Sequence, residues 1–299
     1  MKGLRPSECV LVSYFAYIAL LAAAWRLPVG TQALACMLPL ILLSLAWLES
    51  RYGSKATGVF REWIVPGVVL IAYQEIRWFE QISGGYRLER KWVAWDRLVL
   101  EDWHLRAAIE SWGPTVPFAL DLSYLLVYAM PPLALAILYR NHLRNRIEVF
   151  LFTFLLGTLF AYAVLPYFPS APPRWAFPGD DLPHVNTVLR RLNVWILDRY
   201  DIRTSVFPSG HVTAAFSSAF GMLLAFPEKK RVGGLLMVLA TAIAITTVYG
   251  RYHYLVDGVA GFLVSALAAN VAQAFLPVSY LDRKSAPQNL PETSIIDAT

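Results

Sequence analysis

Long apolar runs constrain the fold of this chain more than any other feature. They recur along the 299 residues, and each run is about 20 residues long, enough to cross a hydrocarbon core roughly 30 Å thick. Backbone polar groups in lipid must be satisfied within the chain, so runs of this kind fold as helices. We therefore predict an all-α polytopic bundle of about eight membrane helices. The expected spans are 7–26, 31–48, 59–75, 115–139, 147–168, 208–227, 232–249 and 254–276.

Composition supports a membrane protein over a soluble one. Hydrophobic residues make up 57% of the chain and charged residues only 16%, which is rare among soluble domains. The net charge is +5, but the basic residues lie in short clusters between apolar runs and not on one face, which argues against a nucleic-acid partner. Cys9 and Cys36 both fall within predicted membrane helices, so no disulfide framework is expected.

The positions of lysine and arginine predict which connections share a side of the membrane. Positive charge is concentrated at both termini and in three connections, around residues 51–55, 140–146 and 229–231. By the positive-inside rule these segments are cytoplasmic. The connections 27–30, 76–114, 169–207 and 250–253 then lie outside. Segment 76–114 mixes both charge signs and contains five tryptophans, which is typical of a segment at the membrane interface.

A short polar motif, Pro208-Ser209-Gly210-His211, precedes one apolar run. Proline suits the first turn of a helix, so Ser209 and Gly210 are expected at a helix start. Free N–H groups and the positive end of the helix dipole favour an anion there, and glycine lets the anion approach closely. His211 is then placed to donate a proton to a leaving oxygen.

A second polar motif opens the last apolar run, where His253 is followed by Asp257. Residues four apart lie one above the other on a helix, so Asp257 can accept a hydrogen bond from one ring nitrogen of His253. The other nitrogen then keeps a lone pair that can attack phosphorus. The pairing would also explain why a carboxylate is tolerated in an apolar segment. By the lysine and arginine count, both motifs lie on the outer side.

Two arginines are candidates for binding the phosphoryl oxygens, because guanidinium groups match their charge and geometry. They are Arg251, two residues before His253, and Arg174, in the connection 169–207. Ser209 and Gly210 complete the predicted phosphate-binding set. No metal site is predicted, because the remaining histidines lack the spacing of metal ligands.

These motifs resemble those of the type-2 phosphatidic acid phosphatase and vanadium haloperoxidase superfamily, over roughly residues 166–261. The resemblance implies a six-helix phosphatase-like core, with His211 protonating the leaving group and His253 forming a phosphohistidine supported by Asp257. Tyr167 stands where that superfamily has a lysine, seven residues before Arg174. The third motif has Thr246-Thr247 where the superfamily has Ser-Arg.

Ala171-Pro172-Pro173 and Tyr252-His253-Tyr254 resemble the branch that includes inositol phosphorylceramide synthases, which implies head-group transfer in sphingolipid metabolism. The prediction is a membrane enzyme that needs no cofactor or metal and acts on a lipid phosphate or pyrophosphate ester. Water or an alcohol or lipid acceptor would take the phosphoryl group. The alternatives are head-group transfer of the inositol phosphorylceramide synthase kind, and a noncatalytic transporter or scaffold.

Residues 1–284 are expected to form one integral membrane domain, with the outer interfacial segment 76–114 as part of it and 285–299 as a mobile tail. The expected location is a bacterial inner membrane. The active site would face the periplasm or exterior, and both termini would be cytoplasmic.

Overall fold

A computed structural model describes residues 4–53, 55–81, 86–204 and 206–276, and these ranges contain helices and no strand, which confirms the all-α prediction. The predicted tail 285–299 lies outside the described residues. The α-helices are α1 (Pro6–Ala24), α2 (Val29–Tyr52), α3 (Lys55–Trp63), α4 (Val65–Glu75), α5 (Arg87–Arg97), α6 (Leu105–Glu110), α7 (Thr115–Leu126), α8 (Met130–Arg140), α9 (Ile147–Val164), α10 (Pro173–Ala176), α11 (Val188–Tyr200), α12 (Gly210–Ala225), α13 (Lys230–Tyr249) and α14 (Leu255–Phe275). Short helical turns link several of them: η1 (Ile76–Phe79), η2 (Leu98–Asp102), η3 (Arg144–Arg146), η4 (Leu165–Tyr167) and η5 (Pro227–Lys229).

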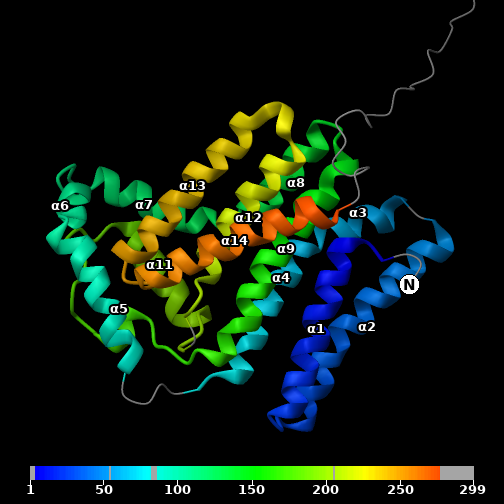
Figure 1. Cartoon of the computed structure of the whole chain (residues 1–299), viewed down its shortest axis with the longest axis horizontal. Coiled ribbons are helices and arrows are strands. Elements are labelled where there is room, and N and C mark those ends of the chain that lie inside the picture. Colours follow the sequence, from blue (N-terminus) through cyan, green and yellow to red (C-terminus); the bar gives the residue numbers. More distant parts are fainter. Residues whose placement is uncertain (1–3, 54, 82–85, 205, 277–299) are drawn as a thin grey trace, which may run out of the picture.

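Helix α12 lies at the centre of the bundle. It packs against α9, α13 and α14, while α4 packs on α9 and α7 packs on α13. Helices α1 and α2 pair with each other, and α1 leans on the outside of α9 (Figure 1). The helix that begins with the first polar motif is therefore surrounded by other helices, whereas α2 exposes most of its side chains.

Within the described residues, five helices are long and apolar enough to cross a membrane, and the number rises to seven if each of two bent pairs forms one span. This confirms a multi-pass membrane protein. The remaining predicted span, 208–227, is the 16-residue helix α12. It is shorter than the roughly 20 residues of a typical crossing.

Two spans predicted as continuous helices are broken. The pair α3 and α4 bends by 42°, and the pair α7 and α8 bends by 71°. Pro66 lies in the first turn of α4, and Pro131 and Pro132 lie in the first turn of α8. Proline lacks an N–H and its ring clashes with the preceding turn, so a continuous helix is interrupted there. Both breaks border the cavity described below.

The connections predicted to share the outer side meet at one end of the bundle. Arg106 in α6 donates hydrogen bonds to the carbonyls of Asp181 and Leu182, which links 76–114 to 169–207. Arg174 donates to the carbonyl of Tyr252 and so reaches 250–253. The ring of Trp25 packs on Phe79 at a centroid distance of 5.4 Å, beside the connection 27–30. Figure 1 shows α5, α6 and α11 gathered at this end.

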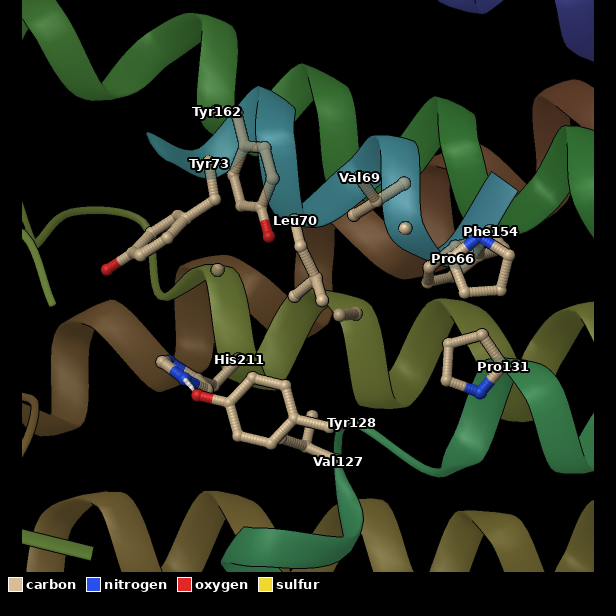
Figure 2. A pocket seen from close by; sticks show the side chains of 13 residues that line it. Pro66, Val69, Leu70, Tyr73, Val127, Tyr128, Pro131, Phe154, Tyr162 and His211 are labelled. Carbon is tan, nitrogen blue, oxygen red and sulfur yellow. Dashed lines mark hydrogen bonds between the residues drawn. The ribbon is translucent and has the colours of Figure 1, made fainter. Parts of the chain in front are cut away.

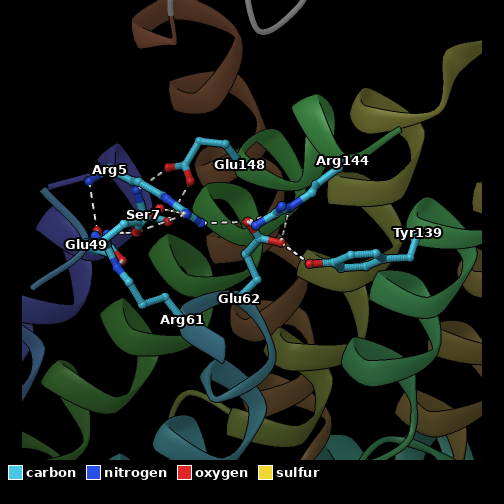
Figure 3. A network of polar contacts seen from close by, with 9 residues as sticks. Arg5, Ser7, Glu49, Arg61, Glu62, Tyr139, Arg144 and Glu148 are labelled. Carbon is cyan, nitrogen blue, oxygen red and sulfur yellow. Dashed lines mark hydrogen bonds and ion pairs between the residues drawn. The ribbon is translucent and has the colours of Figure 1, made fainter. Parts of the chain in front are cut away.

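The N-terminal segment and the connection 140–146, both predicted to be cytoplasmic, meet at the opposite end around Glu62 in α3 (Figure 3). This carboxylate is 4% exposed and accepts hydrogen bonds from Arg5 at 2.8 Å, from Arg144 at 3.1 Å and from the Tyr139 hydroxyl. Buried charge is costly unless it is paired, so this network stabilises one arrangement of α1, α3, α8 and the start of α9. The bundle thus has two chemically distinct ends.

Candidate active site

The first motif forms the N-terminus of α12. Ser209 is the N-cap, and its hydroxyl accepts a hydrogen bond from the Val212 amide, which explains why a serine ends the preceding loop. The sequence predicted Pro208 in the first turn of the helix, but Pro208 lies one residue before the N-cap. The backbone N–H groups of Gly210 and His211 belong to the first turn and have no acceptor within the helix.

Glycine is required at position 210 because the ring of Tyr162 lies close to it. A Cβ atom at this position would lie 2.8 Å from Cε1 of Tyr162 in α9. Any larger residue would push the ring or the helix start aside. Glycine therefore brings the start of α12 close to α9, in addition to the predicted access for an anion.

The second motif differs from the expected helical pair, because His253 lies in the turn before α14. Asp257 occupies the third position of that helix, where its Oδ2 atom accepts a hydrogen bond from the Tyr254 amide at 2.9 Å. The same oxygen lies 3.4 Å from Nδ1 of His253. That distance exceeds a typical hydrogen bond, and neither Nδ1 nor Asp257 Oδ1 has a hydrogen-bond partner among the described residues. The carboxylate caps α14 and also faces the imidazole.

The two histidines converge although they come from different helices. The centroids of the His211 and His253 rings are 5.9 Å apart. Tyr124 in α7 stacks on His211 at 5.0 Å, and the Tyr128 hydroxyl forms a 3.1 Å hydrogen bond with its Nε2 atom. Ser209 donates its amide to the Asp257 carbonyl at 3.0 Å, so the starts of α12 and α14 are joined directly. The sequence motifs thus form one site.

Arg174 and Asp201 form an ion pair beside the histidines, with Nη2 and Oδ2 2.5 Å apart. Asp201 also accepts a hydrogen bond from the Tyr73 hydroxyl. Burial alone would raise the pKa of Asp201, but the charge of Arg174 and hydrogen bonds from Tyr73 and Arg174 keep this pKa below its usual value. Burial likewise opposes the charge on Arg174, yet Asp201 raises its pKa. Both groups are therefore charged at neutral pH.

His253 is neutral at neutral pH. The pKa of His253 is lowered from 6.5 to about 4, chiefly by burial; Arg174 also lowers it, while Asp201 and a hydrogen bond with the Val206 backbone raise it. A neutral imidazole keeps the lone pair that a nucleophile needs. The geometry and the charge state of His253 both fit that role.

Arg251 is paired away from the histidines. Its Nη1 lies 2.6 Å from Asp96 in α5, and its Nη2 lies 3.8 Å from Asp181. Asp96 also accepts a hydrogen bond from the Leu255 amide, and burial raises the pKa of this carboxyl to about 6. The side chain of Arg251 is only 1% exposed. In this arrangement Arg251 links the turn that carries His253 to α5.

His211 lies where two cavities meet. The first, which we call the lateral cavity, has a volume of about 140 Å³ and is apolar along most of its length. Figure 2 shows His211 and Tyr128 at one end and Pro66, Phe154 and Pro131 at the other. The second, the central pocket, has a volume of about 750 Å³. Its polar lining includes Asp201, and both cavities share the side chains of His211 and Tyr128.

Several residues of the site carried no sequence signal. Asp201, Tyr73 and Tyr128 belong to no recognisable motif, and each reaches the histidines only because helices break or cross there. An acidic residue ten positions before His211 is the one sequence feature that could have indicated Asp201. Among the described residues, no group of three or more His, Cys, Asp or Glu side chains could hold a metal ion.

Comparison with known families defines the class of protein. The family model of the PAP2 superfamily matches residues 90–271, more than half of the chain and a region that contains every predicted site residue. The chain therefore belongs to the PAP2 superfamily, whose members are generally phosphoesterases. No curated protein sequence and no solved structure gave a significant match. A phosphatase-type enzyme in a membrane is the function that superfamily membership supports.

Proposed function

We propose that this protein is a lipid phosphatase or phosphotransferase that cleaves a phosphate or pyrophosphate ester through a phosphohistidine on His253. One observation carries the proposal. His211 and His253 lie 5.9 Å apart beside the Arg174–Asp201 pair, and His211 lines both an apolar cavity and a pocket whose lining includes the charged side chains of Arg77, Arg199 and Asp201. A lipid phosphate needs both environments, one for its chain and one for its charge.

In the first step, a ring nitrogen of His253 attacks phosphorus, a P–N bond forms and the P–O bond to the leaving group breaks. The attack replaces the contact between the ring and the Val206 backbone. His211 donates its proton to the departing oxygen. Asp257, 3.4 Å from Nδ1, orients the ring and stabilises the positive charge that develops on it.

In the second step, the oxygen of water or of an alcohol attacks the same phosphorus. The P–N bond breaks, and the proton of the attacking hydroxyl passes to His211, which restores the enzyme. The amides of Gly210 and His211 and the guanidinium of Arg174 bind the phosphoryl oxygens in both steps. Ser209 holds these amides in place through its cap. These steps need no metal ion or other cofactor.

Arg251 was a further phosphate-binding candidate. Its ion pair with Asp96 supports a different role, in which it positions the turn that carries His253. Arg174 is the stronger candidate for direct contact with phosphate, because it acts on the pKa of His253 and on that of Asp201. To reach the phosphate, Arg174 must exchange part of its pairing with Asp201.

The finer assignment within the superfamily is head-group transfer of the inositol phosphorylceramide synthase kind. It is supported by the Ala171-Pro172-Pro173 and Tyr252-His253-Tyr254 segments, which flank the site from two connections. For orientation, we propose a bacterial inner membrane with both termini cytoplasmic and the active site facing the periplasm or exterior. The support is that the connections at the end opposite the histidines, 51–55, 140–146 and 229–231, carry lysine and arginine and no acidic residue.

The test is an assay of the purified full-length protein with a panel of lipid phosphates, scored for free phosphate and for head group transferred to added alcohols. His253→Ala and His211→Ala are each expected to lower kcat/KM by at least about a thousandfold, because each removes a group that bonds to or protonates the reacting atoms. His184→Ala is the matched control. His184 is exposed at the same end of the molecule and should leave activity unchanged. Undiminished activity in His253→Ala would overturn the mechanism.

A further inference from the structure

A third cavity lies on the other side of α11 from the central pocket. Its volume is about 500 Å³, and we call it the arginine pocket because Arg174, Arg190 and Arg191 line it. Helix α11 forms the wall between the two cavities. Its Arg190 and Arg191 face the arginine pocket, whereas its Leu197 and Tyr200 line the central pocket.

The inner part of the arginine pocket contains buried guanidinium groups with unused donors. Arg190 is 7% exposed and pairs with Asp121 at 3.3 Å, but its Nε atom has no hydrogen-bond partner among the described residues. The Nε atom of Arg174 also has no hydrogen-bond partner among the described residues. A guanidinium has five N–H donors, so each ion pair leaves donors over for a second anion. A buried donor of this kind is costly unless a ligand accepts from it.

The lining offers guanidinium groups to an anion. Arg174 and Arg190 are paired with Asp201 and Asp121, and the third arginine, Arg191, is exposed at the rim, where Asp198 is the one carboxylate among the lining residues. Guanidinium groups bind phosphate strongly, because two parallel N–H groups can meet two oxygens. The chemistry of the arginine pocket therefore fits a phosphate group.

The outer surface of α11 indicates where that phosphate comes from. Val188, Leu192 and Trp195 are 57%, 42% and 50% exposed, and their spacing places them on one face of the helix. An exposed apolar stripe on a helix with arginines beside it is typical of a helix lying at a membrane interface. Trp195 also lines the arginine pocket, so the stripe leads directly to the arginines.

We propose that the arginine pocket binds the phosphate headgroup of a membrane lipid other than the one that is cleaved, with its chains beside the stripe on α11. The proposal rests on the proposed function only in assigning cleavage to the central pocket. Arg174 joins the two sites, because it lines the arginine pocket and its Nη2 atom holds Asp201 in the central pocket. A lipid bound in the arginine pocket would therefore influence the position of Arg174 at the reaction centre.

The experiment measures lipid binding without turnover. Full-length protein carrying His253→Ala is purified in neutral detergent and titrated with phosphatidylglycerol, and bound lipids are counted by native mass spectrometry. Arg191→Gln removes the rim charge, and Arg190→Lys keeps the charge opposite Asp121 but removes the Nε donor. Each is expected to weaken binding of the tightest phosphatidylglycerol by about tenfold or more, as the loss of one charge-assisted hydrogen bond predicts. Arg90→Gln, an exposed site on α5 at the same end, should have no such effect.

Three outcomes would overturn the proposal: unchanged binding in both pocket variants, equal weakening by Arg90→Gln, or displacement of the lipid by inorganic phosphate or glycerol 3-phosphate at similar concentrations. The last would assign the pocket to a free phosphate compound. The test is independent of catalysis. If His253→Ala keeps full activity while the pocket variants lose lipid, the proposed mechanism fails and the lipid site stands.

Discussion

At the scale of single residues, the proposed chemistry requires opposite roles in proton transfer from two imidazoles. His253 must offer a lone pair, while His211 must carry a proton to the leaving oxygen. Burial makes His253 neutral, and Arg174 and Asp201 lie close enough to shift its pKa in opposite directions. This pair of charges therefore adjusts the nucleophile as well as the phosphate site.

The sign of each shift gives a testable pH dependence. Only neutral His253 can attack, so the acid limb of kcat/KM that belongs to it should lie near pH 4 and not near 6.5. Arg174→Gln removes a positive charge, raises the pKa of His253 and should move this limb to higher pH. Asp201→Asn removes a negative charge and should move it to lower pH. Residual activity measured from pH 3.5 to 8, roughly the range over which the limb would appear, checks both signs; movement of both variants in the same direction would refute the assignment.

At the scale of helices, the site depends on how closely α12 and α14 approach. Gly261 makes this approach possible, because a Cβ atom there would lie 2.9 Å from Thr213 Oγ1 and 3.0 Å from the Ser209 carbonyl oxygen. Gly258, almost one turn earlier, is different. The nearest atom to its added Cβ would be Cγ2 of Val212, at 4.0 Å.

The two glycines form a matched pair of substitutions. Gly261→Ala should push α14 from the cap of α12, destabilise the protein by about 1–3 kcal/mol and lower kcat/KM by roughly ten- to a hundredfold, since small displacements of reacting groups are costly. Gly258→Ala should fold and act almost as the wild type does. Thermal unfolding in detergent and the lipid phosphate assay give both numbers. Equal effects of the two substitutions would contradict the role of the close approach.

The sequence predicted helices better than it predicted their interruptions. Apolar length located the spans, and the motif residues identified His211, His253 and Asp257 as candidates. The sequence did not show that the turn before α8 would bring Tyr128 to His211, because a proline in an apolar run can either kink a helix or begin one. Asp201 was equally hidden, since its partners Arg174 and Tyr73 are 27 and 128 residues away along the chain.

At the scale of the whole molecule, the bundle has one end built around the histidines and another built around Glu62. Counting lysines and arginines predicted which connections would lie together, and contacts within each end agree with that grouping. The count works because the membrane separates the connections into two sets before any packing is considered.

Which end faces outward can be tested by labelling single cysteines in intact cells, in a Cys9→Ala and Cys36→Ala background. Asp102→Cys lies beyond α5 at the histidine end, and Lys230→Cys lies at the start of α13 at the other end; both positions are exposed. A membrane-impermeant maleimide should label residue 102 in intact cells and residue 230 only after the membrane is opened. The reverse pattern would place the active site in the cytoplasm.

The central claim is that phosphorus passes through His253, and rapid quenching tests it most directly. Full-length protein is mixed with ³²P-labelled phosphatidate or polyprenyl pyrophosphate, labelled in the phosphoryl group to be transferred, and stopped during turnover. We predict an acid-labile, base-stable label on the peptide containing His253, which is absent in His253→Asn and present in His184→Asn. Turnover with no label on the protein, or a label that remains in His253→Asn, would contradict the account.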